Sequence, residues 1–280
     1  MTSVASTTPG GRFDAIVPPD EVQRELPYDR ALELGCGTGF FLLNLIQAGG
    51  VARRGSVTDL SPGMVKVATR NGQGLGLDID GKVADARASR TRTTPSTWWS
   101  ATPCCTTSPD VELSLREVVR VLKPGGRFVF AGGEPTSKGN VYARNLSTLT
   151  WHLSTNITKL PGLEGWRRPQ AELDESSRAA ALEAVVDLHT FEPSDLERMA
   201  TNAGAVQVAT ASEEFTAAML GWPIRTFEAS VPPPGRLGWG WAKFAFNSWT
   251  SLSWVDANVL RRVVPKGWFY NVMVTGVKPS

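Results

Sequence analysis

The sequence predicts an α/β fold whose core is a doubly wound, mainly parallel sheet. In the stretch 30–50, RALELGCGTGFFLLNLIQAGG, a short apolar run meets three alternate glycines and then an apolar helix. Residues 55–60, GSVTDL, read as a second strand that ends in Asp59, 20 residues after the last of those glycines. In residues 111–132 a helical stripe, a Lys-Pro-Gly-Gly stop and an apolar strand follow one another. Strands and helices that alternate in this way build a parallel sheet with helices on both faces.

Composition argues against several classes of protein but leaves the number of domains open. The 280 residues are enough for one large α/β domain or two small ones. The 29 basic residues nearly balance the 27 acidic ones, and no basic run favours nucleic acid. The three cysteines form no disulfide framework, and we expect a cytoplasmic protein. No run is long and apolar enough for a membrane span, and the first dozen residues lack the apolar core of a signal peptide.

The three glycines of the turn predict a ligand at the carboxyl end of the first strand. Glycine permits the tight turn and lets a ligand approach the backbone. The dinucleotide fingerprint G-x-G-x-x-G requires a third glycine where this chain has Phe40. The pattern is instead E-x-G-x-G-x-G, which resembles the motif of class I S-adenosylmethionine (SAM)-dependent methyltransferases of the type 11-like group. The resemblance implies that the turn contacts the amino-acid part of SAM through Glu33, Gly35, Cys36, Gly37, Thr38 and Gly39.

The end of the second strand adds a carboxylate and a helix start. Asp59 has the lone pairs to accept both ribose hydroxyls, and Ser61 followed by a proline begins a helix. The spacing D-x-S-x-x-M resembles the same family, in which the methionine, here Met64, lies against the adenine. Leu60, between the acid and the serine, is included in the expected cofactor site.

Two further segments carry the resemblance. Residues 79–86 predict a third strand that ends at Asp85 and Ala86, and in the family an acid at this place accepts from the adenine amino group. Asp110 then begins a helix, and the phrase LREVVRVLKPGGRFVF resembles the helix, turn and fifth strand of the family. The resemblance implies a Rossmann-like, seven-stranded sheet with an antiparallel last strand and a helical C-terminal cap.

The segment from Arg87 to Ser108 does not fit this pattern. It reads RASRTRTTPSTWWSATPCCTTS, whereas the family has an acidic loop, a buried strand of the type F-D-L-V-V and a His-His pair. The same bases read one nucleotide earlier, with a consistent choice of codons, give EGVSYEDDTFDLVVGHAVLHHI before Pro109 and Asp110. We hypothesise two compensating frameshifts, at about residues 87 and 109; a genuinely divergent loop is the alternative. Resequencing of this segment of the gene that finds the codons in the frame given would remove the hypothesis.

The anomalous segment has consequences for stability and for the site. A fourth strand covered on both faces requires a continuous apolar run, and residues 96–102 supply two large rings flanked by hydroxyls. We therefore expect the chain as written to be less stable, or less active, than the repaired one. The repaired reading has histidines at the positions of Thr102, Thr106 and Thr107. Thr102 follows the fourth strand, beside the place expected for the methyl group.

The C-terminal half is less informative. Residues 171–188 and a helix from Pro193 to Gly204 have helical patterns, AVQVATA reads as a strand, and GWFYNVMVTGVKP resembles the last strand of the family. Between these strands, two helices around a proline run carry five of the ten tryptophans. They predict an aromatic helical core, a lid over an apolar or aromatic acceptor, a dimer face or a membrane-contacting patch. The expected divisions are a lead-in segment 1–29, a SAM-binding half 30–135, and 136–280, which completes the sheet at about 193–212 and 267–279 around a cap at about 213–266.

These observations predict methyl transfer from SAM to a small, apolar or aromatic acceptor. The catalytic residue is unknown, since His152 and His189 lie outside the motifs, and no metal-ligand spacing occurs. Two alternatives are a SAM-binding protein that is catalytically impaired and acts as a scaffold, and an NAD-dependent oxidoreductase. We expect no nucleic-acid partner and a possible homodimer through the aromatic cap.

Overall fold

The computed structural model describes residues 27–85, 96–101, 110–131, 138–174, 178, 191–231 and 236–280. The described residues form two compact units. Unit 1 is drawn from Met1–Glu134, His189–Ala211 and Asn271–Ser280, and unit 2 from Pro135–Leu188 and Ser212–Tyr270. The lead-in segment up to residue 26 and most of the helix expected over 171–188 lie outside the described part.

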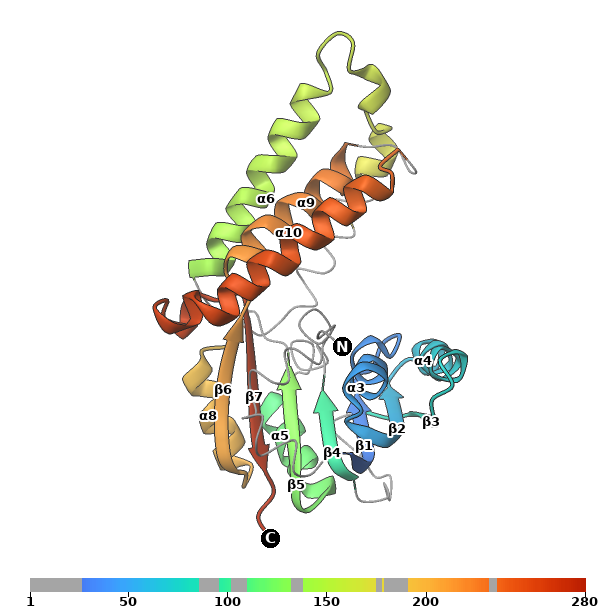
Figure 1. Ribbon diagram of the computed structural model, residues 1–280, viewed down its shortest axis with the longest axis vertical. Coiled ribbons are helices and arrows are strands. Elements are labelled where there is room, and N and C mark those ends of the chain that lie inside the picture. Colours follow the sequence, from blue (N-terminus) through green and yellow to red (C-terminus); the bar gives the residue numbers. More distant parts are fainter. Residues whose placement is uncertain are drawn as a thin grey trace. The chain divides into compact units, whose positions relative to one another are not determined.

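Unit 1 is built on a seven-stranded sheet in the order β3-β2-β1-β4-β5-β7-β6 (Figure 1). The paired strands from β3 to β5 run parallel, and β7 runs antiparallel to β5. The α/β class with a mainly parallel sheet is therefore confirmed. The strands are β1 (Tyr28–Leu34), β2 (Ala52–Asp59), β3 (Ile79–Val83), β4 (Ser96–Ala101), β5 (Leu122–Ala131), β6 (Val206–Glu213) and β7 (Asn271–Val277).

Helices cover both faces of this sheet. Successive strand residues point to opposite faces, so the strands present apolar side chains on each face that must be buried. Ala31 and Val129 belong to the buried cluster formed with the first two helices, and Leu32 and Phe128 to the cluster formed with the other two. The helices on the first face are α3 (Phe40–Gly49) and α4 (Pro62–Gly74). Those on the second are α5 (Val111–Val121) and α8 (Pro193–Asn202).

The predicted helix starts are confirmed by their caps. The Ser61 side chain accepts from the Met64 N–H at 3.4 Å, and the Asp110 carboxylate accepts from the Leu113 N–H at 2.8 Å. The helix ends at Val121, in agreement with the stop expected at residues 123–126, but the strand expected from Arg127 already begins at Leu122. The register with β4 shifts across this stretch, so the glycines form an irregularity inside the strand.

The anomalous segment contributes the central strand of the sheet. Residues 96–101 form β4, which pairs in parallel with β1 on one side and β5 on the other. The remainder of 87–108, including Thr102, Thr106 and Thr107, lies outside the described residues.

The described residues of unit 2 include three long helices, of which α9 packs against the other two. They are α6 (Lys138–Ile157), α9 (Thr216–Ser230) and α10 (Trp239–Asn258), with short 3₁₀ turns at η3 (Glu164–Trp166), η4 (Leu260–Arg262) and η5 (Lys266–Trp268). The sequence predicts α9 and α10 but misses α6, so the helical unit is larger than the expected cap. Within the described part, no helix is both long and apolar enough to cross a bilayer.

Candidate functional site

The turn after β1 has the backbone conformation that its glycines predict. Gly35, Gly37 and Gly39 have φ values of 65°, 51° and 82°, in the left-handed region that other residues avoid. A Cβ added to Gly39 would lie 2.9 Å from Leu43 Cδ1, so this glycine allows α3 to pack closely. A Cβ added to Gly37 would meet no heavy atom within 4 Å. Gly37 therefore keeps open a space beside the turn that a side chain would enter.

Asp59 links the turn to the end of β2. Its Oδ2 accepts from the Gly37 N–H at 2.9 Å, and its Oδ1 accepts from the Ser61 N–H at 2.8 Å. A carboxylate has about four lone-pair sites, so each oxygen keeps capacity for a further donor. The side chain is partly exposed. A pair of hydroxyls near Gly37 would find in Asp59 a fixed, charged acceptor.

Glu33 lies behind the turn instead of facing this space. It is fully buried, and its Oε2 accepts from the Leu42 N–H at 3.4 Å in the first turn of α3. Its carbonyl oxygen accepts from Thr58 Oγ1 at 2.8 Å. A carboxylate near the positive end of a helix dipole is stabilised there. Glu33 thus fixes the start of α3 relative to β1 and β2.

Cys36 is a structural member of the turn. Its N–H donates to the Thr58 carbonyl at 2.9 Å, and its own carbonyl accepts from the Gly39 N–H at 2.7 Å. Burial raises the pKa of the Cys36 thiol to about 12, and the negative charges of Glu33 and Asp59 add to this effect. The thiol is therefore protonated near neutral pH and is a poor nucleophile.

The ends of the neighbouring strands supply apolar side chains and a second acid. Leu60 and Met64 are 68% and 44% exposed. Thr38 is exposed, and its carbonyl accepts from the Asn71 side chain at 3.1 Å. Asp85 is half-buried two residues beyond β3, while Ala86 lies outside the described residues.

Sequence reasoning missed two residues at this edge. Phe40, at the start of α3, is 69% exposed, and Val83, at the end of β3, is 53% exposed. The apolar run of 40–48 gives no sign of which member faces out, because every position in it is suited to a buried helix. The exposure of Val83 could not be predicted either, because a valine in a strand is usually buried.

The described residues offer no second catalytic constellation. They contain no group of three His, Cys, Asp or Glu side chains that could hold a metal ion. His152 is exposed on α6, and His189 lies outside the described part. The described site therefore resembles a binding surface for a cofactor more than an acid–base centre.

Comparison with known proteins agrees with this geometry. A family model described as a methyltransferase domain matches residues 31–126. No curated protein matches the chain significantly.

Solved structures similar to this chain include methyltransferases at low sequence identity. Phosphoethanolamine N-methyltransferase 2 of Haemonchus contortus, in complex with SAM, is 15% identical with a TM-score of 0.53; the match covers 98% of this chain and 54% of that protein. This chain thus spans about half of that enzyme's length. The [4+2]-cyclase SpnF is 17% identical with a TM-score of 0.51, over 93% of this chain and 80% of that protein. At such identities the similarity establishes the fold, and the activity of the methyltransferase domain must be argued from its own residues.

Proposed function

We propose that this protein transfers a methyl group from SAM, bound at the carboxyl ends of β1, β2 and β3. The glycine turn would contact the amino-acid part of the cofactor, Asp59 the ribose hydroxyls, Met64 the adenine ring and Asp85 its amino group. The observation that carries the proposal is Asp59, since its two oxygens are oriented by the Gly37 and Ser61 N–H groups. These bonds prepare the carboxylate before any ligand arrives.

When bound, SAM would supply a sulfonium methyl group, which the acceptor would displace from the sulfur with the thioether as leaving group. For such a displacement, much of the rate enhancement can come from positioning and from exclusion of water. The residues of the turn and of the β2 end hold the cofactor in one orientation. A base is required only if the acceptor must lose a proton, and the proposal assigns none.

Calorimetric titration with SAM tests the cofactor site. We expect saturable binding to the native chain, and a loss of affinity of about 10- to 100-fold in Asp59→Asn, because a charged acceptor of two hydroxyls is replaced. Asp78→Asn is the matched control: Asp78 directly precedes β3 in unit 1, and its exposed carboxylate pairs with Arg54. Equal affinity of the native chain and Asp59→Asn for SAM, or binding of NAD in place of SAM, would contradict the proposal.

The acceptor is proposed to be small and apolar or aromatic. Unit 2 supports this choice with a cavity of about 450 Å³ between α6 and α9. Its lining is almost entirely apolar and comprises Tyr142, Asn145, Leu146, Leu149 and Met219. A screen of small apolar, aromatic and polar acceptors with labelled SAM tests the class. Transfer to polar acceptors alone would exclude it.

A SAM-binding protein without catalysis is the second candidate function. It is favoured by the composition of 87–108, which lies where the family has its fourth strand and the residues that follow it. The two functions differ in one measurement, transfer of label from SAM to any component of a cell extract. The second function would be favoured if the chain as written binds SAM but transfers no label, while a chain with residues 87–108 repaired does transfer label.

The assembly and location remain predictions. We propose a homodimer through unit 2, whose helix α10 exposes Trp239, Phe246 and Trp254. Such aromatic surface is typical of interfaces. A monomeric mass by light scattering at about 10 μM, well above the Kd of most stable dimers, would exclude it. The cytoplasmic location depends on the cysteine content alone.

A further inference from the structure

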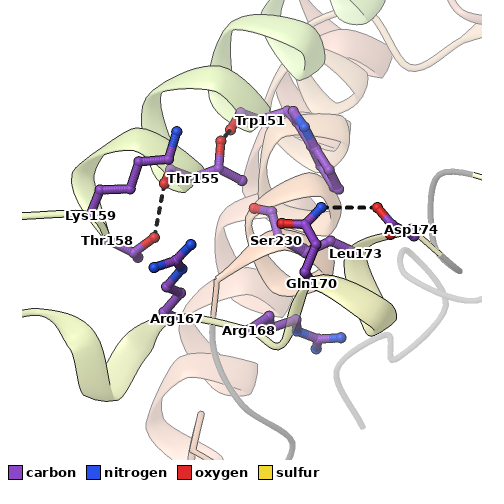
Figure 2. Close-up of a pocket in the computed structure, with 10 residues that line it drawn as sticks. All are labelled: Trp151, Thr155, Thr158, Lys159, Arg167, Arg168, Gln170, Leu173, Asp174 and Ser230. Atoms are coloured by element: carbon purple, nitrogen blue, oxygen red, sulfur yellow. Dashed lines mark hydrogen bonds between the residues drawn. The ribbon is translucent and has the colours of Figure 1, made fainter.

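Unit 2 contains a second cavity, of about 270 Å³, that the proposed methyl transfer does not use. It lies between the C-terminal part of α6, the segment that follows it and the last residue of α9 (Figure 2). Its lining residues are Trp151, Thr155, Thr158, Lys159, Arg167, Arg168, Gln170, Leu173, Asp174 and Ser230. The cavity is large enough for a small organic molecule, but below the usual range for a cofactor.

Positive charge dominates the lining. Three cations, Lys159, Arg167 and Arg168, face one carboxylate, that of Asp174. The Asp174 carboxylate already accepts from Gln170 Nε2 at 2.9 Å. A cavity with this excess of fixed cations attracts an anion.

The cations are held in different ways. Arg168 donates from Nη2 to the Glu228 carbonyl at 2.9 Å and lies 3.7 Å from the Glu172 carboxylate, so its guanidinium is fixed. Lys159 Nζ donates to the neutral Asn156 side chain at 2.8 Å, which leaves its charge unneutralised by that bond. Among the described residues, no carboxylate pairs with the guanidinium of Arg167. Lys159 and Arg167 are therefore the groups that can take up a ligand's charge.

The two ends of the cavity differ in character. Figure 2 shows Lys159, Thr158 and Arg167 on one side and Trp151 and Leu173 on the other. The hydroxyl of Thr158 donates to the Thr155 carbonyl at 3.0 Å, so its oxygen lone pairs remain for a ligand. The Trp151 ring and Leu173 offer an apolar wall. A ligand with a compact anionic head and a short apolar or aromatic body suits this arrangement.

We propose that this cavity binds a small phosphate ester, with the phosphate at Lys159 and Arg167 and the ester group against Trp151 and Leu173. A phosphate presents three acceptor oxygens and up to two charges, which match an arginine fork and a lysine ammonium better than a single carboxylate does. The site is independent of the cofactor site: all of its lining residues belong to unit 2, whereas those of the cofactor site belong to unit 1.

Calorimetric titration of the full chain with phenyl phosphate tests the proposal, with inorganic phosphate and phenylacetate as companion probes. We expect saturable binding of phenyl phosphate, about tenfold weaker binding of phenylacetate, and binding that weakens as salt is raised. In Lys159→Gln/Arg167→Gln the affinity for phenyl phosphate should fall more than about tenfold, because two charge-assisted contacts are lost. The matched control is Arg225→Gln/Lys243→Gln, which removes two exposed cations of unit 2 outside the cavity.

Two results would overturn the proposal. One is the absence of saturable heat with phenyl phosphate up to about 10 mM, far above the concentration range of specific sites. The other is an equal loss of affinity in the control pair, which would indicate only a general attraction to positive charge. If the double variant melts at a lower temperature than the native chain, Arg167→Gln alone replaces it, because this exposed side chain has no carboxylate partner among the described residues. Neither result depends on SAM binding or methyl transfer.

Discussion

Two glycines of the turn have different tasks, and substitution by alanine should separate them. Gly39 has φ +82° and lies against Leu43 and Ala68, so Gly39→Ala should lower the free energy of unfolding by about 2 kcal/mol. Gly37 has φ +51° but open space around it, so Gly37→Ala should cost about 1 kcal/mol of stability while it weakens SAM binding strongly. Urea unfolding and calorimetry measure the two effects. The reverse assignment would show that the open space is not the cofactor site.

The buried thiol of Cys36 should make stability fall at alkaline pH. Folding raises its pKa to about 12, so the protonated thiol stabilises the fold below its ordinary pKa of 9.0, and this contribution is lost as the pH rises from there toward 12. Within this window the free energy of unfolding falls by up to about 1.4 kcal/mol for each pH unit. We expect the free energy of unfolding to fall more steeply between pH 9 and 10.5 (about 1–2 kcal/mol) in the native chain than in Cys36→Ala. Parallel curves would contradict the assignment.

At the site, the sequence predicts the residues whose conformation is set by local chemistry. Local backbone geometry decides the residue type at several positions, and the spacing of these residues in the sequence therefore reveals them. They are the glycines with positive φ, Asp59 at the end of a strand and Ser61 before a proline. Exposure is different, because it depends on what the rest of the chain covers. Glu33, which the resemblance includes in the cofactor site, is fully buried, whereas Phe40, at the third-glycine position of the dinucleotide fingerprint, is 69% exposed.

At the scale of elements, β4 is the strand whose sequence agrees least with its place. It lies between β1 and β5, in a sheet covered by helices on both faces, where a continuous apolar run is expected. The shifted reading places F-D-L-V-V-G at positions 96–101, the six positions that form β4.

Replacement of residues 87–108 by the shifted reading should therefore stabilise the protein. Large rings or hydroxyls in a central strand that requires an apolar run are expected to cost about 1–3 kcal/mol each, and their removal should raise the melting temperature by about 5–10 °C. Calorimetry of the two chains measures this shift. A chain in which only 87–95 is replaced is the control, since it leaves β4 as it is. Equal melting temperatures for the native and fully replaced chains would contradict the prediction.

Helix α9 depends on a buried carboxylate from α10. Asp256 is 2% exposed and accepts from the N–H groups of Phe215, Thr216 and Ala217 at 2.8 to 3.0 Å, and from the Thr216 hydroxyl at 2.6 Å. It thus satisfies the free donors at the start of α9 in place of a local cap. Asp256→Asn should lower the free energy of unfolding by about 2–4 kcal/mol, because an amide turns one acceptor into a donor facing donors.

Chemical denaturation of Asp256→Asn checks this prediction. Asp195→Asn is a suitable control, since Asp195 lies in the first turn of α8 and its exposed carboxylate pairs with Arg198. The control should lose less than about 1 kcal/mol, as surface ion pairs usually do. A similar loss in both variants would show that the Asp256 contacts stabilise little.

The elements themselves were predictable where their pattern is strong. Helices α4 and α5 each begin at a capping side chain, Ser61 and Asp110, which the sequence shows directly. Helix α6 was missed because Thr, Ser, Asn and Trp alternate along it, and its apolar residues do not form the buried stripe of a typical surface helix: Leu149, Leu153 and Ile157 are half exposed. Its stability comes from packing against α9, a contact that no local pattern reveals.

At the scale of the whole molecule, the order of segments along the chain makes the stability of unit 1 depend more on unit 2 than the reverse. Unit 2 is formed by 135–188 and 212–270, segments of 54 and 59 residues, both inserted into unit 1. If unit 2 unfolds, unit 1 must close two loops of these lengths, at a cost of about 7 kcal/mol. If unit 1 unfolds, unit 2 must close only the 23 residues of 189–211, at about 3 kcal/mol. The free energy of unfolding of a domain is about 5–15 kcal/mol. Unit 2 can therefore stay folded after unit 1 has unfolded, because loop closure then costs only about 3 kcal/mol. Unit 1 cannot easily stay folded after unit 2 has unfolded, because loop closure then costs about 7 kcal/mol.

Calorimetric melting should therefore show unit 1 unfolding first, with unit 2 unfolding at a higher temperature. SAM at 100 times its Kd should stabilise unit 1 by about 2.7 kcal/mol and raise only the lower transition, by about 5–10 °C, until it approaches the upper one. Hydrogen exchange during heating identifies the units, because amides of β1 and β2 should lose protection before those of α9 and α10. Loss of protection in α9 and α10 before β1 and β2 would contradict the coupling, whereas an unmoved lower transition would contradict SAM binding.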